Sequence, residues 1–518
     1  MIKRVLLFNL FTLRLISLIR VFTLINKYRF NGLNLNIEDL LGAHHKLIMD
    51  PVHGGIPLLK HEVLIVDHPL FQRLRFICQN DILSLVFPGA THSRFLHSIG
   101  TMHVGGRMFD AMIENSIKQK SRQGVSGITS ETLEAISFFK RLVRCACLLH
   151  DSGHSSFSHQ FNRTPTIKKI LGQSGRFEQL WQGIDVSDLY PKIPEQLEHE
   201  HFSVRAAYQI LSDIPANILQ APVSDILSLM DTTQVTPSTQ FSRHAAALWP
   251  LIQTEKIAPK NTPDKFAKKL QHLLASLVSG ELDADRADYM LRDGFHSSVT
   301  IGGFNLDHLL SNLHFGWCTQ THWFGLAISQ KGLGSLEDFV YSRHQMYRQV
   351  YAHKTAQGFD WLLRAAIDEV MTQKSVLTFV KQCLNDIQKF RHLTDSYFWE
   401  AFRQYAESYD KSYSQCILER IRMPHIATRE NLSSEEELHY LNFLAKEQNC
   451  SHKKLVSSSI TARFTKIRDD FSGIKVLIHD HQTKTLTLRL ISNTSQFFGK
   501  FTDERITHFY MNPLTCTN

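Results

Sequence analysis

One short stretch of the sequence, CLLHDSGHSSFSHQF from Cys147 to Phe161, gathers three histidines around a single carboxylate. His150 and Asp151 are adjacent, and His154 and His159 follow closely. Imidazole nitrogens and carboxylate oxygens are common ligands of divalent transition metals, and histidine also exchanges protons near neutral pH. Taken alone, the His150–Asp151 pair is equally typical of a hydrogen bond inside a protein core. The stretch therefore allows two interpretations, a metal site or a group of structural histidines.

Two other segments favour the metal site. THSRFLHSIG contains Arg94 and His97 one helical turn apart, and SGELDADRADYMLRD contains Asp285 among closely spaced aspartates. His97, His150, Asp151 and Asp285 make a mixed set of nitrogen and oxygen ligands. Such a set suits zinc, iron, manganese or nickel and leaves coordination positions for water or phosphate oxygens. A metal ion bound there could activate water and neutralise phosphate charge.

The segments that must position these residues have mostly helical patterns. Residues 130–151 begin with Ser130 as a suitable N-cap and acidic residues in the first turn, followed by apolar residues at helical spacing. The end of this segment, CACLL, is apolar on all sides, so we expect it to be buried and to carry His150 and Asp151 into the interior. Residues 335–371 predict another long helix, and GIKVLIHD and KTLTLRLIS predict a late β-hairpin.

Composition indicates a soluble globular protein with a sizeable core, because 43% of the 518 residues are hydrophobic and 20% are charged. The net charge of +8 is compatible with an anionic ligand such as a nucleotide or nucleic acid. Nucleic acid is not specifically indicated, since no basic stripe is interleaved with aromatic residues. The eight cysteines are scattered without a CxxC pair. This excludes a zinc-ribbon pattern or small disulfide framework and favours reduced thiols in the cytoplasm.

The N-terminal segment, residues 1–45, is strongly apolar, but Arg14 and Arg20 interrupt it. Its longest uncharged run, Val5 to Leu13, is far shorter than the roughly 20 residues that a membrane-spanning helix needs. A secretory signal is not expected, since no small-residue cleavage site follows. A membrane-surface helix, a docking helix and an extension upstream of the true start remain open, and we favour the last.

The order H…HD…D on separate helices resembles the HD superfamily of metal-dependent phosphohydrolases. Within it, the chain is most similar to the deoxynucleoside triphosphate (dNTP) triphosphohydrolases, although it contains no sterile-alpha-motif segment. The matching blocks span residues 46–354: KLIMDPVHGGIPL, DHPLFQRLRFICQND, VFPGATHSRFLHSIG, CLLHDSGHSSFSHQF, EHEHFSV, ELDADRADYMLRD and YRQVYAHK. The resemblance implies a mainly α fold, with an HD-domain helical core at residues 46–368. A smaller mixed α/β C-terminal lobe, with helices and the β-hairpin, is expected at residues 369–518.

The resemblance implies metal-dependent hydrolysis of a dNTP to a deoxynucleoside and intact triphosphate, with water attacking the α-phosphorus. The four candidate ligands would hold a divalent transition metal, and Mg²⁺ is expected on the substrate phosphates. The implied acid–base groups are His154, His159 and His199. Arg94, one turn before His97, is expected to bind phosphate oxygens during catalysis.

Further residues match the substrate-binding positions of the family: Gln79, Arg286, Tyr289, Asp293, Arg343 and Tyr351. By resemblance the two arginines bind phosphates and the two tyrosines contact the deoxyribose, Tyr351 excluding a 2′-hydroxyl. Gln79 and Asp293 would bind the 3′-hydroxyl. Core packing is the alternative role of the tyrosines.

Two positions depart from the family pattern. Asn162 stands where the family has an aspartate after FSHxF, and Tyr347 replaces a histidine. An amide can orient an acid–base histidine but adds no charge, so we expect a less basic histidine and slower turnover. Glu198 or Glu200 could supply the missing carboxylate.

The resemblance also extends to regulation. Lys46, Asp67, Gln72 and Arg75 match positions where the animal enzyme binds an activating guanine nucleotide between subunits, which implies a homo-oligomer, either a dimer or a tetramer. The motif FQRLR also packs the fold, so a purely structural role is the alternative. Two other functions stay open: an HD phosphohydrolase acting on another nucleotide, and a weakly active HD protein that binds nucleotide or nucleic acid.

Overall fold

The computed structural model describes residues 45–124, 128–230, 235–253, 265–301, 303–318, 321–462, 473–479, 486–498 and 503–515. The segment 1–45 is thus almost wholly outside the described residues. The fold is mainly helical with three small sheets, as the sequence predicts. Among the described residues, no helix is both long and apolar enough to cross a membrane.

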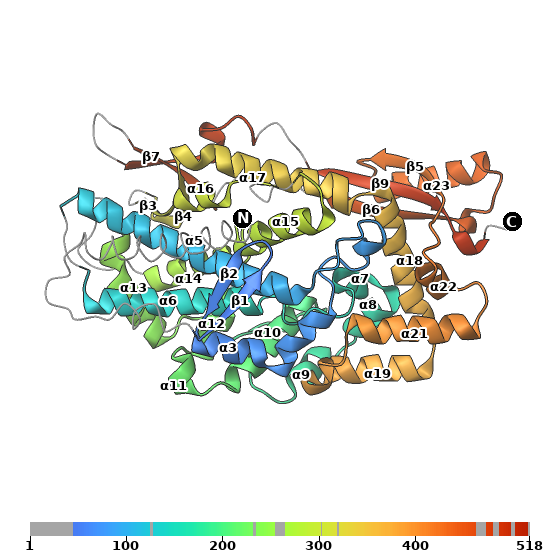
Figure 1. Cartoon of the computed structure of the whole chain (residues 1–518), viewed down its shortest axis with the longest axis horizontal. Helices are drawn as coiled ribbons and strands as arrows, with labels where there is room; N and C mark the ends of the chain where they lie inside the picture. Colours follow the sequence, from blue (N-terminus) through green and yellow to red (C-terminus); the bar gives the residue numbers. More distant parts are fainter. Residues whose placement is uncertain are drawn as a thin grey trace, which may run out of the picture.

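The helices of the first part of the chain form most of the molecule (Figure 1). They are α3 Lys60–Asp67, α4 Pro69–Gln72, α5 Arg94–Arg122, α6 Ser130–Leu149, α7 Ser158–Arg163, α8 Pro165–Leu171, α9 Arg176–Trp181, α10 His199–Ser212, α11 Ala216–Leu219, α12 Val223–Met230, α13 Thr239–Ile252, α14 Phe266–Val278, α15 Ala284–Ser297, α16 Leu306–Ser311, α17 Leu333–Met346 and α18 Lys354–Val370. Five more follow: α19 Lys374–Asn385, α20 Ile387–Phe390, α21 Asp395–Ser408, α22 Tyr413–Leu418 and α23 Ser434–Glu447.

The centre of the fold is the packing of α5 against α6 and α15. The C-terminal end of α6, from Cys145 to Leu149, is fully buried, as its all-round apolar sequence predicts. The N-cap of α6 is Thr129 rather than the predicted Ser130, because the Thr129 side chain accepts a hydrogen bond from the Thr132 amide and Ser130 becomes the first helical residue.

The strands form three sheets at separate places. They are β1 Lys46–Asp50, β2 Gly54–Leu58, β3 Leu313–Cys318, β4 Trp323–Ser329, β5 His425–Glu430, β6 Leu455–Ala462, β7 Lys475–His479, β8 Leu486–Leu490 and β9 Glu504–Met511. β1 and β2 form an antiparallel hairpin. The other sheets have the orders β3-β4-β7-β8 and β5-β9-β6, and they lie towards opposite ends of the molecule (Figure 1).

The predicted late hairpin is present, since β7 and β8 pair in antiparallel fashion. β7 also pairs in parallel with β4, so a strand from the C-terminal third completes a sheet of the first part. Residue 368 lies inside α18, which also packs against α22 and β9. The two parts of the chain therefore share both a helix and a sheet.

The helix predicted over residues 335–371 is interrupted. α17 ends in a π-helical turn, Tyr347–Tyr351, in which the Ala352 amide bonds to the Tyr347 carbonyl. His353 is extended and caps α18, because its side chain accepts a hydrogen bond from the Thr355 amide. Apolar periodicity does not distinguish an α-helix from one wide turn, which explains the error.

Candidate metal centre

The four candidate ligands come together at the α5–α6–α15 contact. His97 is in the first turn of α5, His150 and Asp151 directly follow α6, and Asp285 is in the first turn of α15. His97 Nε2 lies 3.0 Å from Asp285 Oδ1 and 3.6 Å from Asp151 Oδ2. His150 Nε2 lies 3.5 Å from Asp285 Oδ1 and 3.4 Å from Asp151 Oδ1.

The orientation of the two imidazoles fits a metal ion. His97 Nδ1 is 2.8 Å from Asp288 Oδ2, and His150 Nδ1 is 2.8 Å from the Cys147 carbonyl. A proton on each Nδ1 satisfies these acceptors and leaves the Nε2 lone pair facing the carboxylates. Both Nε2 atoms are buried without a hydrogen-bond partner, so a metal ion would satisfy them.

The charges of the site favour the binding of a cation. Burial would lower the pKa of His97, but the neighbouring carboxylates of Asp285 and Asp288 outweigh it and raise the pKa to about 10. For Asp285, burial is likewise outweighed by His150 and His97, which lower the pKa of this carboxyl. Metal ligands must be deprotonated, so a metal ion would replace the proton held here.

A buried network around Asp288 supports His97, and the sequence analysis did not assign it a role. Asp288 Oδ1 lies 2.7 Å from His53 Nε2, and Arg292 binds both Asp288 oxygens at 2.9 Å. Arg292 also donates to Asp50 at 2.8 Å. The only sequence signal was the position of Asp288, three residues after Asp285 in the same acidic segment.

Arg94 is buried beside the centre. Its Nη1 pairs with Asp151, its Nε donates to Ser158 Oγ at 2.7 Å, and its Nη2 reaches the Gln79 carbonyl at 3.4 Å. A surface ion pair is thereby excluded for this residue. The Gln79 side chain is also buried, and its Oε1 has no hydrogen-bond partner. Arg94 and Gln79 are therefore within reach of the same small region.

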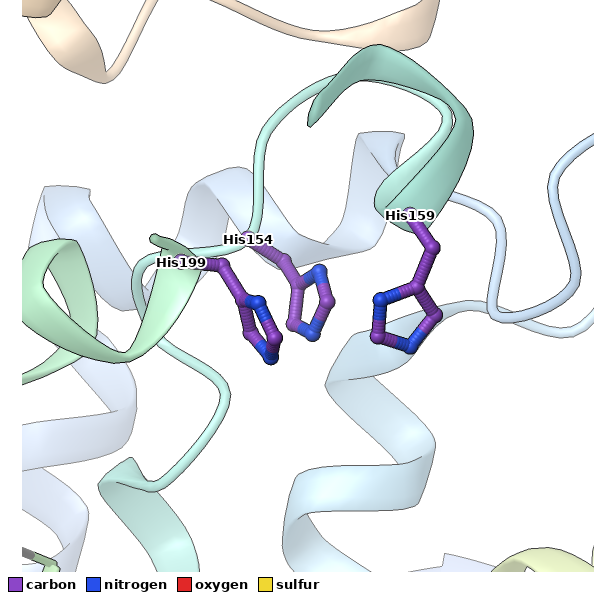
Figure 2. Close-up of side chains that lie close together, drawn as sticks. All are labelled: His154, His159 and His199. Atoms are coloured by element: carbon purple, nitrogen blue, oxygen red, sulfur yellow. The ribbon is translucent and has the colours of Figure 1, made fainter. Parts of the chain in front are cut away.

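The histidine triad consists of His154, His159 and His199, whose imidazole rings lie close together (Figure 2). They come from the loop after α6, from α7 and from the start of α10. His154 Nε2 lies 3.3 Å from Asp151 Oδ1. Burial, together with Arg94 and His199, holds the pKa of His154 well below its usual range, so this imidazole is neutral at pH 7.

Close backbone packing brings α10 to the triad. A Cβ atom at Gly153 would lie 2.0 Å from the Ser203 amide nitrogen, so only glycine permits this approach.

Asn162 is half-buried on α7. The carboxylate beside His199 comes from Glu200, whose Oε2 lies 3.1 Å from His199 Nδ1.

The candidate substrate residues occupy α15, α17 and the π-helical turn. The Tyr351 hydroxyl donates to Asp293 Oδ2 at 2.5 Å, and His92 Nε2 lies 2.8 Å from Asp293 Oδ1. The Arg343 guanidinium lies 5.3 Å from the centroid of the Tyr347 ring, which in turn packs edge-on against Tyr351. His92 is a further contact that the sequence analysis did not identify.

Two other predicted substrate residues lie on α15. Arg286 pairs with Asp283 and the Gly280 carbonyl, and Tyr289 is half-buried beside Arg343 and Tyr347. Arg343 Nε is buried without a hydrogen-bond partner. The guanidinium of Arg343 thus has an unused donor.

The candidate regulatory residues lie on β1, α3, α4 and the 3-10 turn Arg73–Phe76 that follows α4. Lys46 Nζ is 3.3 Å from Asp67 Oδ1, and Arg75 Nε donates to Gln72 Oε1 at 2.7 Å. All except Gln72 are exposed. The structure therefore brings them together as two pairs on the surface.

Known proteins similar to this chain include named dNTP hydrolases. No family model matches the chain. Deoxynucleoside triphosphate triphosphohydrolase SAMHD1 of Bos taurus is 27% identical over 402 residues, which cover 76% of this chain and 59% of the bovine protein. The human protein of that name is 27% identical over 372 residues, 68% of this chain and 50% of its own length. An uncharacterized protein of Methanocaldococcus jannaschii is 26% identical over 360 residues, covering 68% of this chain and 57% of that protein.

The chain spans between half and three fifths of the length of these relatives.

Two solved structures share the fold. A phosphohydrolase from Bacteroides thetaiotaomicron has a TM-score of 0.57 and 22% identity, covering 90% of this chain and 99% of the other. A hypothetical protein from Aquifex aeolicus has a TM-score of 0.56 and 21% identity, covering 90% and 96%. The chain is therefore similar in sequence to proteins named deoxynucleoside triphosphate triphosphohydrolase, as its motif order predicts.

Replacing Asp288 by asparagine should weaken metal binding. Asp288→Asn keeps the side-chain shape but removes the charge that orients and polarises His97, so metal affinity should fall by about 10- to 100-fold. Competition of the purified protein against a metal-binding dye measures this. Asp307→Asn is the control, because Asp307 is exposed on α16 and pairs with Arg107 of α5. Equal affinities of wild type and Asp288→Asn would contradict the assigned role.

Proposed function

We propose that the protein hydrolyses deoxynucleoside triphosphates to a deoxynucleoside and triphosphate, as a metal-dependent phosphohydrolase. The observation that carries the proposal is the convergence of His97, His150, Asp151 and Asp285 from three separate segments, with both imidazole Nε2 atoms buried and unpartnered. The names of the relatives support the same chemistry.

The four ligands would hold a divalent transition metal, which supplies charge neutralisation on the phosphates and an activated water. Arg94 adds a fixed guanidinium beside this position, where it could exchange its bond to Asp151 for phosphate oxygens. Arg343, with its unpartnered Nε, would bind phosphate from the other side. Mg²⁺ on the substrate phosphates would complete the neutralisation.

The histidine triad would move the protons. During hydrolysis a water oxygen bonds to the α-phosphorus while the bond from phosphorus to the 5′ oxygen breaks. The water loses a proton and the leaving 5′ oxygen gains one. His159, the exposed member of the triad, would donate to the leaving oxygen, and neutral His154 and His199 could accept and pass protons.

The paired Asp293 and Tyr351 would select the sugar. The Asp293 carboxylate is held by His92 and the Tyr351 hydroxyl, so it is oriented before substrate binds. It could accept a hydrogen bond from the 3′-hydroxyl, and the Gln79 side-chain amide could donate one to the same hydroxyl oxygen. Tyr351 would then lie against the 2′ carbon and disfavour ribose.

Incubation with each dNTP and Fe²⁺, Mn²⁺, Zn²⁺ or Ni²⁺ should release deoxynucleoside and tripolyphosphate in equal amounts, because attack at the α-phosphorus leaves the triphosphate intact. Anion-exchange chromatography separates the products. Orthophosphate or pyrophosphate would instead indicate hydrolysis of another nucleotide bond. Binding without turnover would indicate a nucleotide-binding protein.

The matched control is the double variant His150→Ala/Asp151→Ala, which removes half of the proposed ligands. Hydrolysis should fall to background, with the helical content checked by circular dichroism. Activity that survives this change would refute the site.

Replacing Asn162 by aspartate should speed turnover. Asn162→Asp adds a carboxylate on α7 near the triad, and a nearby negative charge raises the pKa of a histidine. We expect kcat to rise and the limb of the pH–rate profile that reports the acid–base histidine to move to higher pH. Asn162→Ala is the comparison. An unchanged profile for Asn162→Asp would show that this position does not influence proton transfer.

We further propose regulation by a nucleotide at Lys46, Asp67, Gln72 and Arg75 in a dimer or tetramer. Exposed apolar side chains of Leu47, Met49 and Phe76 adjoin these residues in sequence and could be covered by another subunit. A guanine nucleotide should raise both the oligomer mass in light scattering and the rate on a second dNTP. Arg75→Ala should abolish both effects, and identical rates and mass with and without the nucleotide would contradict the proposal.

A further inference from the structure

Three consecutive residues each carry a buried polar atom that has no hydrogen-bond partner within the described part of the chain. The atoms are Gln79 Oε1, Asn80 Nδ2 and Asp81 Oδ1. The Gln79 side chain is 8% exposed, whereas Asn80 and Asp81 are half-buried. Polar groups removed from water are normally hydrogen-bonded, because leaving them unpaired costs free energy. Three such atoms in succession therefore indicate a surface that a polar ligand covers.

The backbone of this segment is fixed beside the proposed phosphate and sugar groups. The Gln79 amide donates to the His92 carbonyl at 3.0 Å, and Arg94 Nη2 donates to the Gln79 carbonyl at 3.4 Å. Four residues further on, Leu83 belongs to a buried apolar cluster against which Tyr351 packs. The segment therefore runs from the proposed phosphate side to the tyrosine of the proposed sugar side. Since the base is attached to the sugar away from the phosphates, this stretch is placed to meet it.

The carboxyl group of Asp81 is unusual in both conformation and environment. Its φ is 52°, in the left-handed region that disfavours residues with a side chain. Glycine would meet this requirement without strain, so the turn itself does not need an aspartate. Burial, together with Asp360, raises the pKa of Asp81 well above its usual range. A ligand that donates hydrogen bonds to this carboxylate would stabilise its charged form.

We propose that Asn80 and Asp81 form a guanine-binding subsite, an inference that rests on the proposed hydrolysis of dNTPs and makes dGTP the preferred substrate. The Asn80 amide would donate to guanine O6, and the two Asp81 oxygens would accept hydrogen bonds from N1–H and N2–H. The Watson–Crick edge of guanine presents one acceptor followed by two donors. Adenine, cytosine and thymine have no two adjacent donors on this edge. The protein's order of one donor and two acceptors therefore matches guanine among the four bases.

The selectivity should appear in kcat/KM for the four dNTPs. Every reaction contains the same metal and one fixed concentration of GTP, so that the proposed regulatory site is filled equally. Hydrolysis of dGTP should be about 5- to 150-fold more efficient than hydrolysis of dTTP, as a bidentate contact to a base typically gives. Deoxyinosine triphosphate differs from dGTP only in lacking the 2-amino group, so it should be hydrolysed less efficiently than dGTP.

Two substitutions of Asp81 test the contact itself. Asp81→Gly removes the carboxylate and suits the positive φ, so it should fold and bring the dGTP-to-dTTP ratio close to one. Asp81→Asn replaces one acceptor by a donor. It should therefore prefer deoxyxanthosine triphosphate, which has an oxygen in place of the 2-amino group, over dGTP. Asn449→Gly is the matched control, because Asn449 has a φ of 47° but is exposed just after α23. It should keep the wild-type ratio.

The outcomes separate this subsite from the proposed function. Release of triphosphate from all four dNTPs with equal efficiency, or a wild-type ratio in Asp81→Gly, would overturn the subsite and leave the proposed function intact. A preference for another base would overturn it as well. If no dNTP is hydrolysed, the proposed function fails, and calorimetric titration with the α,β-imido analogues of dGTP and dTTP decides the subsite. Tighter binding of the guanine analogue would support it, and equal affinities would overturn it.

Discussion

The buried carboxylate of Asp288 is the interaction on which the metal centre depends. It accepts hydrogen bonds from His97, His53 and Arg292, and so sets which nitrogen of His97 faces the site. This carboxylate reaches α5 only because Gly100 has no side chain. A Cβ at Gly100 would lie 1.9 Å from Asp288 Oδ1 and 2.3 Å from Arg292 Nη2. The close packing of α5 on α15 at Gly100 is thus what allows Asp288 to set the tautomer of His97.

Buried charges at the centre lie beside groups of opposite charge. Arg292 lies between Asp288 and Asp50, and Arg94 binds Asp151. Removing one partner of such a pair leaves an uncompensated buried charge, which typically costs about 3–5 kcal/mol. Substitution of one of these charged residues should therefore destabilise the fold, even where the residue does not contact substrate. The arrangement also holds a fixed cation, Arg94, beside Asp151.

The proposed substrate side depends on the break between α17 and α18. The π-helical turn brings the Tyr351 hydroxyl to Asp293 and places Tyr347 against both Tyr351 and Arg343. π-helical turns interrupt regular helices frequently at functional sites. α18 then continues into packing against β9 and α22. The proposed sugar-binding side is therefore anchored in both the first part of the chain and the C-terminal third.

The sequence by itself determined the helical class, the buried end of α6, the late hairpin and the types of the four candidate ligands. Local periodicity and side-chain chemistry are properties of short segments, so they can be recognised without coordinates. The tertiary structure alone decided the tautomers, the meeting of the triad nitrogens and the partners of Asp288. Those partners, at positions 53, 97 and 292, come from the β1–β2 turn, α5 and α15. The tertiary structure also decided the π-helical turn, because a single wide turn depends on the contacts of Tyr351 with another helix rather than on its own sequence.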